Sequence, residues 1–159
     1  MKKIKISKGF TVLVDDEDFD ELNKYKWSAM YSKGRCYAYR QSSRKLGKRS
    51  QIWMHRFILG VVDKKVLVDH KDLNSLNNQK SNLRHATHGQ NQANMSKSKG
   101  SSLFLGVTWD KASLKWRVQI KSSGKIYRIG RFDSEVDAAL AYNRAAISIH
   151  GWFARLNVC

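Results

Sequence analysis

Residues 68–94 hold the side chains of this sequence that are best suited to chemistry. Asp69 and His70 are adjacent, and the stretch also contains six asparagines: Asn74, Asn77, Asn78, Asn82, Asn91 and Asn94. A hard cation such as Mg²⁺ prefers oxygen ligands and keeps several waters, so Asp69 and one amide oxygen could hold it. An ion held by a single carboxylate keeps a net positive charge and attracts a phosphate. The stretch therefore predicts metal-assisted hydrolysis of a phosphodiester.

His70 is the candidate general base. Consecutive side chains of a strand point to opposite sides, so His70 could accept a proton from a water without competing with Asp69 for the metal. The reference pKa of imidazole, about 6.5, suits a base near neutral pH. An Asp-His dipeptide alone is a weak signal, so the spacing of the asparagines matters.

The spacing resembles that of the HNH nucleases with a ββα-metal fold, in the variant found among phage and intron-encoded homing endonucleases. In that family an Asp-His pair is followed at set distances by an Asn and then by a His or Asn. Asn82, twelve residues after His70, and Asn91, nine residues further on, match these positions. The resemblance implies that Asp69 and Asn91 bind the metal and that His70 is the base. It also implies that Asn82 hydrogen-bonds across the loop and holds the His70 strand in register.

The resemblance implies one divalent metal ion, with Mg²⁺ as the first choice and Mn²⁺ as the second. Asn rather than His at position 91 disfavours a transition metal. Cys36 and Cys159 are far apart and form no ligand pair, so we expect no structural zinc and predict that the N-terminal strands brace the site instead. The other loop amides, Asn74, Asn77 and Asn78, are expected to be structural, because Asn is a favoured loop residue.

Four further side chains near the motif have two interpretations each. Arg84 is a candidate phosphate contact, and an ordinary surface arginine fits the sequence equally well. His85 and His88 are expected to be structural or solvent-facing, with phosphate or metal-water contacts as the alternative. We expect His55 to pack against its neighbours or to contact a phosphate, and not to bind the metal.

The charge of the chain points to a polyanionic partner. Thirty Lys and Arg against thirteen Asp and Glu give a formal net charge of +17, far more than solubility requires. Six of the acids lie at 15–21, and none lies between Glu21 and Asp63, where aromatic residues alternate with basic ones. A single charge run can be a solvated face, but this pattern favours a folded basic surface. Double-stranded DNA is the expected partner. A membrane is not, since no run of about 18 apolar residues exists.

The start of the chain lacks the apolar run of a secretory signal. Two isolated cysteines also suit a reducing compartment. We therefore expect a cytoplasmic protein of a bacterium or a phage-infected cell.

The elements expected around the motif define an α+β fold. Short strands are predicted at 3–6, 11–15, 26–31, 35–41, 50–59, 65–72 and 82–87. Helices are predicted at 15–25, near Arg56–Leu59 and from residue 88. We expect an HNH nuclease domain with a basic N-terminal β subdomain at 1–94, a linker at 95–103 and a second small domain at 104–159.

Three strand-like runs in the second domain, at 104–110, 115–123 and 125–132, precede a helix that Ser134 and Asp137 begin as a capping box. Period-2 alternation places Trp116, Val118 and Ile120 on one face of the middle strand and a basic row on the other. Such a sheet can lie in the major groove of DNA.

Residues 104–157 resemble the APETALA/ethylene-response-factor DNA-binding domain. The resemblance is carried by Gly-Val at 106–107, Lys-Trp at 115–116, I-G-x-F at 129–132, A-A-x-A-Y at 138–142 and A-x-L-N at 154–157. It implies a three-stranded antiparallel sheet packed on one helix. The implied base-contacting positions are Thr108, Lys115, Gln119, Lys121 and Arg128, with Arg117 and Lys125 as phosphate contacts. The first turn lacks the Arg-rich run of the plant proteins, so their target sequences cannot be transferred.

Together these features predict a metal-dependent hydrolase, a site-directed DNA endonuclease of the homing type. We expect a monomer or weak dimer that nicks one strand per active site. The main alternative is a non-enzymatic, sequence-specific DNA-binding regulator that keeps a degenerate nuclease fold. An RNA-binding accessory protein is a third possibility, suggested only by charge and aromatic content.

Overall fold

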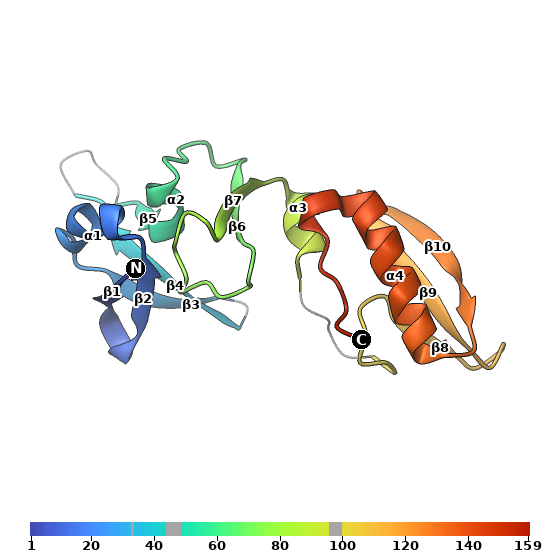
Figure 1. Cartoon of the computed structure of the whole chain (residues 1–159). Coiled ribbons are helices and arrows are strands. Elements are labelled where there is room, and N and C mark those ends of the chain that lie inside the picture. The colour runs from blue at the N-terminus through green and yellow to red at the C-terminus, as the bar shows by residue number, and fades with distance from the viewer. Residues whose placement is uncertain (33, 44–48, 96–99) are drawn as a thin grey trace. The chain divides into compact units, whose positions relative to one another are not determined.

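A computed structural model describes residues 1–32, 34–43, 49–95 and 100–159 (Figure 1). The fold is mixed α+β, with small antiparallel sheets and, in the described residues, four α-helices. The chain divides into two compact units, Met1–Thr87 and His88–Cys159. The division falls earlier than the predicted boundary at residue 94. Residues 96–99 of the predicted linker lie outside the described residues, and the predicted domain limits stay a prediction.

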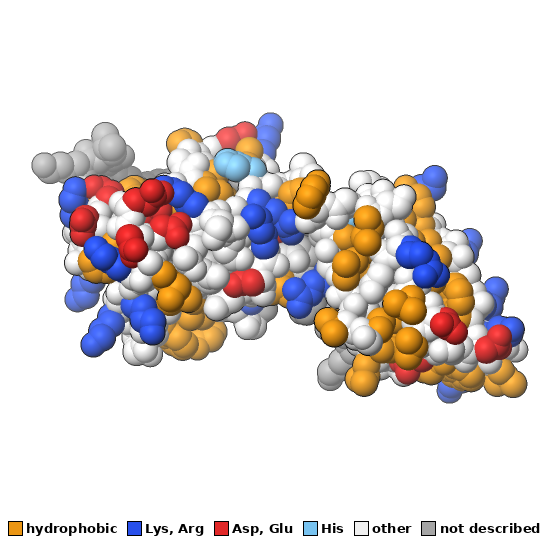
Figure 2. Space-filling model, in the orientation of Figure 1, with side chains coloured by type: hydrophobic (Ala, Val, Ile, Leu, Met, Phe, Trp, Pro, Cys, Tyr) orange, Lys and Arg blue, Asp and Glu red, His pale blue; other side chains and the backbone are white. Residues whose placement is uncertain are grey.

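The first unit begins with the paired strands β1 (Lys2–Lys5) and β2 (Thr11–Val14). Helix α1 (Asp16–Asn23) follows, with three acidic residues in its first turn, where carboxylates stabilise the positive end of the helix dipole. These carboxylates form the acidic patch over α1 in Figure 2. Val12, Val14 and Leu22 are buried in the core of this unit, so α1 packs its apolar side inward.

The strands predicted at 26–31, 35–41 and 50–59 correspond to β3 (Ser28–Ser32), β4 (Arg35–Gln41) and β5 (Gln51–Trp53), which form an antiparallel sheet. Alternation along β4 buries Cys36 and Ala38 on the core side. Helix α2 (Met54–Ile58) begins directly after β5, slightly earlier than predicted. The basic loop between β4 and β5 includes residues 44–48, which lie outside the described residues.

Strands β6 (Leu67–His70) and β7 (Leu83–Ala86) form a two-stranded antiparallel sheet that closes the first unit. The long connection between them contains the asparagine-rich loop. Helix α3 (His88–Ala93) follows β7 in the chain but belongs to the second unit. The order strand, strand, helix agrees with the sequence, and the ββα-metal arrangement of the three elements stays a prediction.

The second unit has a three-stranded antiparallel sheet with β9 (Lys115–Ser122) between β8 (Val107–Asp110) and β10 (Lys125–Phe132). Helix α4 (Glu135–His150) packs on it through small residues such as Ala138 and Ala139, which let helix and sheet approach closely. The Ser134 side chain accepts a hydrogen bond from the Asp137 amide, which confirms the predicted start of the helix. A 3-10 turn, η3 (Gly151–Phe153), ends it.

Within the described ranges, no helix combines the length and the apolar character needed to cross a membrane.

Candidate functional site

The β6–β7 pair places Asp69 directly opposite Arg84. Asp69 is only 2% exposed, and its Oδ2 atom lies 2.7 Å from Arg84 Nη2 and 2.8 Å from Arg84 Nε. A buried carboxylate needs such a partner, because an uncompensated charge in the interior is costly. Arg84, predicted as a possible phosphate contact, therefore binds the carboxylate predicted to hold the metal. An oriented carboxylate of this kind suits a hard cation in charge and in ligand type.

His70 follows Asp69 on β6 and contacts a different set of residues. Its ring is 6% exposed and lies with its centroid 6.2 Å from the Tyr37 ring of β4 and 5.3 Å from the His55 ring of α2. Burial lowers the pKa of His70, although the Asn78 amide and nearby carboxylates oppose this shift. A lowered pKa keeps the imidazole neutral near pH 7, which is the form that can accept a proton.

Aromatic rings from three elements surround His55. Its ring centroid lies 5.8 Å from Tyr37 of β4 and 6.2 Å from Trp53 of β5, in addition to the edge-to-face contact with His70. Burial, together with the nearby His70 and Arg56, lowers the pKa of His55 to about 3. His55 is therefore a neutral imidazole beside the candidate base.

The asparagine-rich loop is cross-linked through Asp72. Asn82 is 8% exposed; its Oδ1 atom accepts from the Asp72 amide at 3.0 Å, and its Nδ2 atom donates to Asp72 Oδ1 at 2.9 Å. Asn77 Nδ2 donates to the other carboxylate oxygen at 2.8 Å. Burial raises the pKa of Asp72, but these donors outweigh it and the net pKa is lowered. Most of the amides thus fix the loop that precedes β7.

Asn78 is the site residue that sequence reasoning did not single out. It is 1% exposed, and its Oδ1 atom lies 3.4 Å from His70 Nε2. An amide oxygen can only accept, so a hydrogen bond here requires the tautomer of His70 with its proton on Nε2 and its lone pair on Nδ1. No sequence pattern distinguishes this amide from its neighbours Asn74 and Asn77.

The first strands of the chain hold this loop in place. The Leu13 amide of β2 donates to Leu76 O at 2.9 Å, and the Asn78 amide donates to Leu13 O at 2.8 Å. Ser75 Oγ donates to Cys36 O of β4 at 2.6 Å, and Asp15 accepts from the Lys80 amide at 2.7 Å. Backbone and side-chain bonds of this kind agree with the expected bracing of the site by the N-terminal subdomain.

Asn91 lies on α3 of the second unit, and each unit is described by itself. Its pairing with Asp69 on one metal ion therefore stays a prediction. In the described residues, no group of three or more His, Cys, Asp or Glu could hold a metal ion. His85 is exposed, and His88 lies 3.2 Å from the Gln92 side chain.

The sheet of the second unit has one apolar and one basic face. Val118 and Ile120 of β9 are buried against α4. The residues that alternate with them along β9 face the other way. Register brings Thr108 and Arg131 beside Arg117, and Arg128 beside Gln119, on this basic face. Its other members are Lys115 and Lys121. Lys115 also pairs with Asp133 at 3.1 Å, and Lys125 at the start of β10 lies over the Tyr127 ring at 5.3 Å.

Arg131 was missed because a β-bulge between Arg128 and Gly130 shifts the register. Strict alternation puts Arg128 and Arg131 on opposite faces, whereas the extra residue brings both to the basic face. Arg131 pairs with Asp110 at 3.0 Å. The Nε atom of Arg117 is buried and has no hydrogen-bond partner within the described part of the chain.

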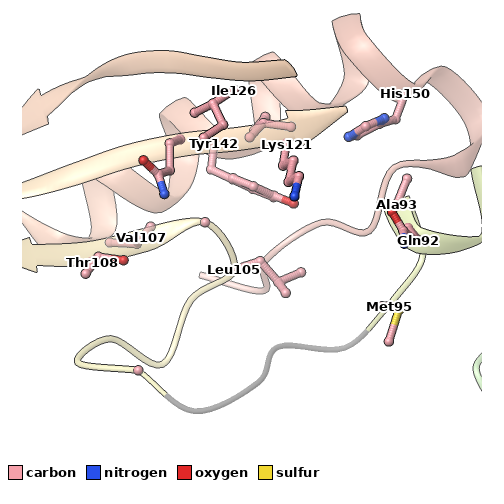
Figure 3. Close-up of a pocket in the computed structure, with 14 residues that line it drawn as sticks. Gln92, Ala93, Met95, Leu105, Val107, Thr108, Lys121, Ile126, Tyr142 and His150 are labelled. Atoms are coloured by element: carbon pink, nitrogen blue, oxygen red, sulfur yellow. The ribbon is translucent and has the colours of Figure 1, made fainter. Parts of the chain in front are cut away.

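A pocket in the second unit adjoins the edge of this face (Figure 3). Thr108 and Lys121 line it together with Tyr142 of α4 and His150 at the end of α4. Three of the predicted DNA contacts, Thr108, Gln119 and Lys121, therefore border a hollow rather than a flat surface.

Comparisons with known proteins gave two viral relatives. The chain is 32% identical over 155 residues to an uncharacterized HNH endonuclease of Acanthamoeba polyphaga mimivirus, across 94% of this chain and 76% of that protein. It is 31% identical over 119 residues to protein 3.8 of Escherichia phage T7, across 74% of this chain and 96% of that protein. No family model matches the chain.

Proposed function

Because the chain belongs to the HNH endonuclease family, we propose that it is a metal-dependent, site-directed DNA endonuclease of the homing type. The observation that carries the proposal is the pair of consecutive β6 residues with separate surroundings. Asp69 is buried and oriented by Arg84, while His70 is a buried, neutral imidazole on the other side of the strand. A metal ligand and a general base need separate surroundings of this kind, because the base must not compete for the metal.

Asp69 would hold the metal ion together with Asn91. A bound Mg²⁺ would supply positive charge to the phosphate oxygens and to the leaving oxygen. The chain's own contribution begins with His70, whose Nδ1 lone pair accepts the proton of the attacking water while Asn78 holds Nε2. Asn82 and Asp72 keep the loop and the end of β6 in place. The products are a 5′-phosphate and a 3′-hydroxyl.

The second unit would select the site. Its three-stranded sheet presents Arg117, Gln119 and Lys121 in one row, which supports an APETALA/ethylene-response-factor type of reader lying in the major groove. Arg and Lys can recognise guanine there, and Gln can recognise adenine. With one active site in each chain, a monomer would nick one strand, and cutting both strands would need a dimer or a second event.

Nicking of a supercoiled plasmid tests the catalytic assignment. Wild-type protein with Mg²⁺ is expected to convert the plasmid to the open-circular form, and chelation of the metal is expected to stop the reaction. His70→Ala is expected to lower the rate by about 100-fold or more, because the general base is lost, while DNA affinity stays the same. Wild-type rates in His70→Ala would contradict His70 as the base.

One observation favours a second candidate function, a DNA-binding regulator without activity. The carboxylate of Asp69 already has a guanidinium partner, and a degenerate site could use that ion pair for stability alone. Tight DNA binding without any metal-dependent nicking would select this function.

A further inference from the structure

We propose that His55 is a second catalytic imidazole, whose ring N–H donates a hydrogen bond to a non-bridging oxygen of the scissile phosphate. This inference rests on the proposed nuclease function and adds a substrate contact from α2 to the residues of β6. It concerns a residue that neither the metal site nor the general base requires.

The position of His55 is fixed from several sides. His55 lies in the first turn of α2, immediately after β5. Its ring meets the His70 ring edge to face at 5.3 Å between centroids and also contacts Tyr37 and Trp53. At this separation the two imidazoles can reach the attacking water and an oxygen of the same phosphate group.

The hydrogen bonds of the described residues do not account for the His55 nitrogens. Within the described residues, the His55 ring makes aromatic contacts but no hydrogen bond to another side chain or to the backbone. His55 is half-buried rather than enclosed, so a ligand from outside the chain can reach its ring. A phenylalanine would satisfy every ring contact, so packing alone does not account for an imidazole.

The surroundings suit a neutral donor to an anion. A pKa of about 3 leaves His55 uncharged at neutral pH, with one N–H donor and one lone pair. The positive charge of Arg56 acts on His55 and favours an anionic group beside that ring. At His70, the carboxylates of Asp72 and Asp69 act more strongly than Arg35. Arg56 itself is held by the carbonyl oxygens of Val66 and Asp63 at 2.6 and 2.7 Å.

The test uses the full chain and a duplex that carries its mapped cleavage site. His55→Phe keeps the ring but loses the N–H, and His55→Gln keeps a donor. His55→Phe is expected to lower the single-turnover rate at saturating protein by about 100-fold, as expected for a lost transition-state donor, with unchanged DNA affinity and melting temperature. His55→Gln is expected to recover part of the rate.

Replacement of one non-bridging phosphate oxygen by sulfur separates a hydrogen bond from a packing role. A residue that only packs would not change the effect of this replacement on the rate. Sulfur accepts hydrogen bonds weakly, so one phosphorothioate diastereomer is expected to slow wild-type protein without rescue by Mn²⁺ or Cd²⁺. The same substitution is expected to have no further effect in His55→Phe.

The possible failures are distinguishable. Wild-type rates in a folded His55→Phe would overturn the assignment and leave His55 as a packing residue. If that variant does not fold, the absence of an unrescued sulfur effect in wild-type protein would overturn it equally. Wild-type protein that binds but never nicks the duplex would contradict the proposed function itself, and the assignment of His55 with it.

Discussion

At the scale of single residues, the first unit holds a buried ion pair between Arg84 and Asp69. Asp69 has a 2% exposed side chain and Arg84 a 15% exposed one. Water therefore screens this pair little, and each partner compensates part of the charge of the other. A cation at Asp69 would take over part of that compensation.

Arg84→Ala is expected to lower the free energy of unfolding by about 3 kcal/mol, because it removes the guanidinium that pairs with a buried carboxylate. Mg²⁺ is expected to raise the stability of this variant more than that of wild-type protein, since the ion replaces the lost charge. Urea unfolding with and without Mg²⁺ measures both effects.

Arg131→Ala is the matched control for this prediction. Arg131 also pairs with a carboxylate, that of Asp110, but its side chain is 56% exposed. Such a surface pair contributes about 1 kcal/mol or less. Equal losses in the two variants would contradict the argument from burial. The absence of a Mg²⁺ effect in Arg84→Ala would contradict the assignment of Asp69 as the metal ligand.

The sequence identified Asp69 and His70, because an adjacent acid and imidazole with spaced amides is an uncommon pattern. It did not identify the partners of these residues. The contacts of His70 with Asn78 and with His55 depend on how a loop and a helix fold back onto β6. Such contacts are tertiary, and no local spacing predicts them.

At the scale of elements, the strands and helices follow from alternation and capping, while the basic face depends on an irregularity. Val118 and Ile120 lie on the predicted core side. The bulge in β10, however, breaks the period of two and adds Arg131 to the row. A bulge of one residue has no reliable signature in a single sequence, although Gly130 next to it is a typical accompaniment.

Gly106→Ala tests how β8 fits against α4. A Cβ atom at Gly106 would lie 2.2 Å from the Tyr142 ring and 2.8 Å from Gln119 O, and φ is +69°. We expect the second unit to lose about 3 kcal/mol or more, from overpacking and backbone strain together. Thermal unfolding followed by tryptophan fluorescence measures this loss.

Gly124→Ala separates the two causes. Its φ of +78° is as unfavourable for alanine, but a Cβ there would meet nothing within 4 Å. We expect a loss of about 1 kcal/mol from strain alone. Similar losses of unfolding free energy at both positions would show that the Tyr142 ring does not pack closely against the chain at Gly106.

At the scale of the whole molecule, each unit has its own apolar core. The predicted limits of the two domains stay a prediction. The position of α3 could not be predicted, because a short polar helix carries no apolar face that would assign it to either core. Figure 2 shows Lys and Arg side chains on both units, in keeping with the net charge of +17.

The double variant Arg117→Ala/Lys121→Ala tests whether the second unit binds DNA while the first unit hydrolyses it. The affinity for DNA is expected to fall, and the slope of log affinity against log salt is expected to decrease by about two, because two phosphate or base contacts are lost. The nicking rate at saturating protein is expected to stay the same. Binding titrations at several salt concentrations measure the slope.

Lys5→Ala, an exposed lysine on β1, provides a control of like charge in the first unit. Its effect on affinity and salt slope is expected to be small. If the double variant binds as tightly as wild-type protein, the basic face of β9 has no role in DNA binding.

The hydrogen bonds that tie the asparagine loop to Leu13, Asp15 and Cys36 limit how this chain can be recombined. A segment that begins shortly before β6 would carry the reactive side chains but not the scaffold that shapes their loop. Grafts and circular permutations that separate residues 1–40 from 66–87 should therefore yield inert proteins. A transferable nuclease would need the whole first unit together with Asn91 of α3.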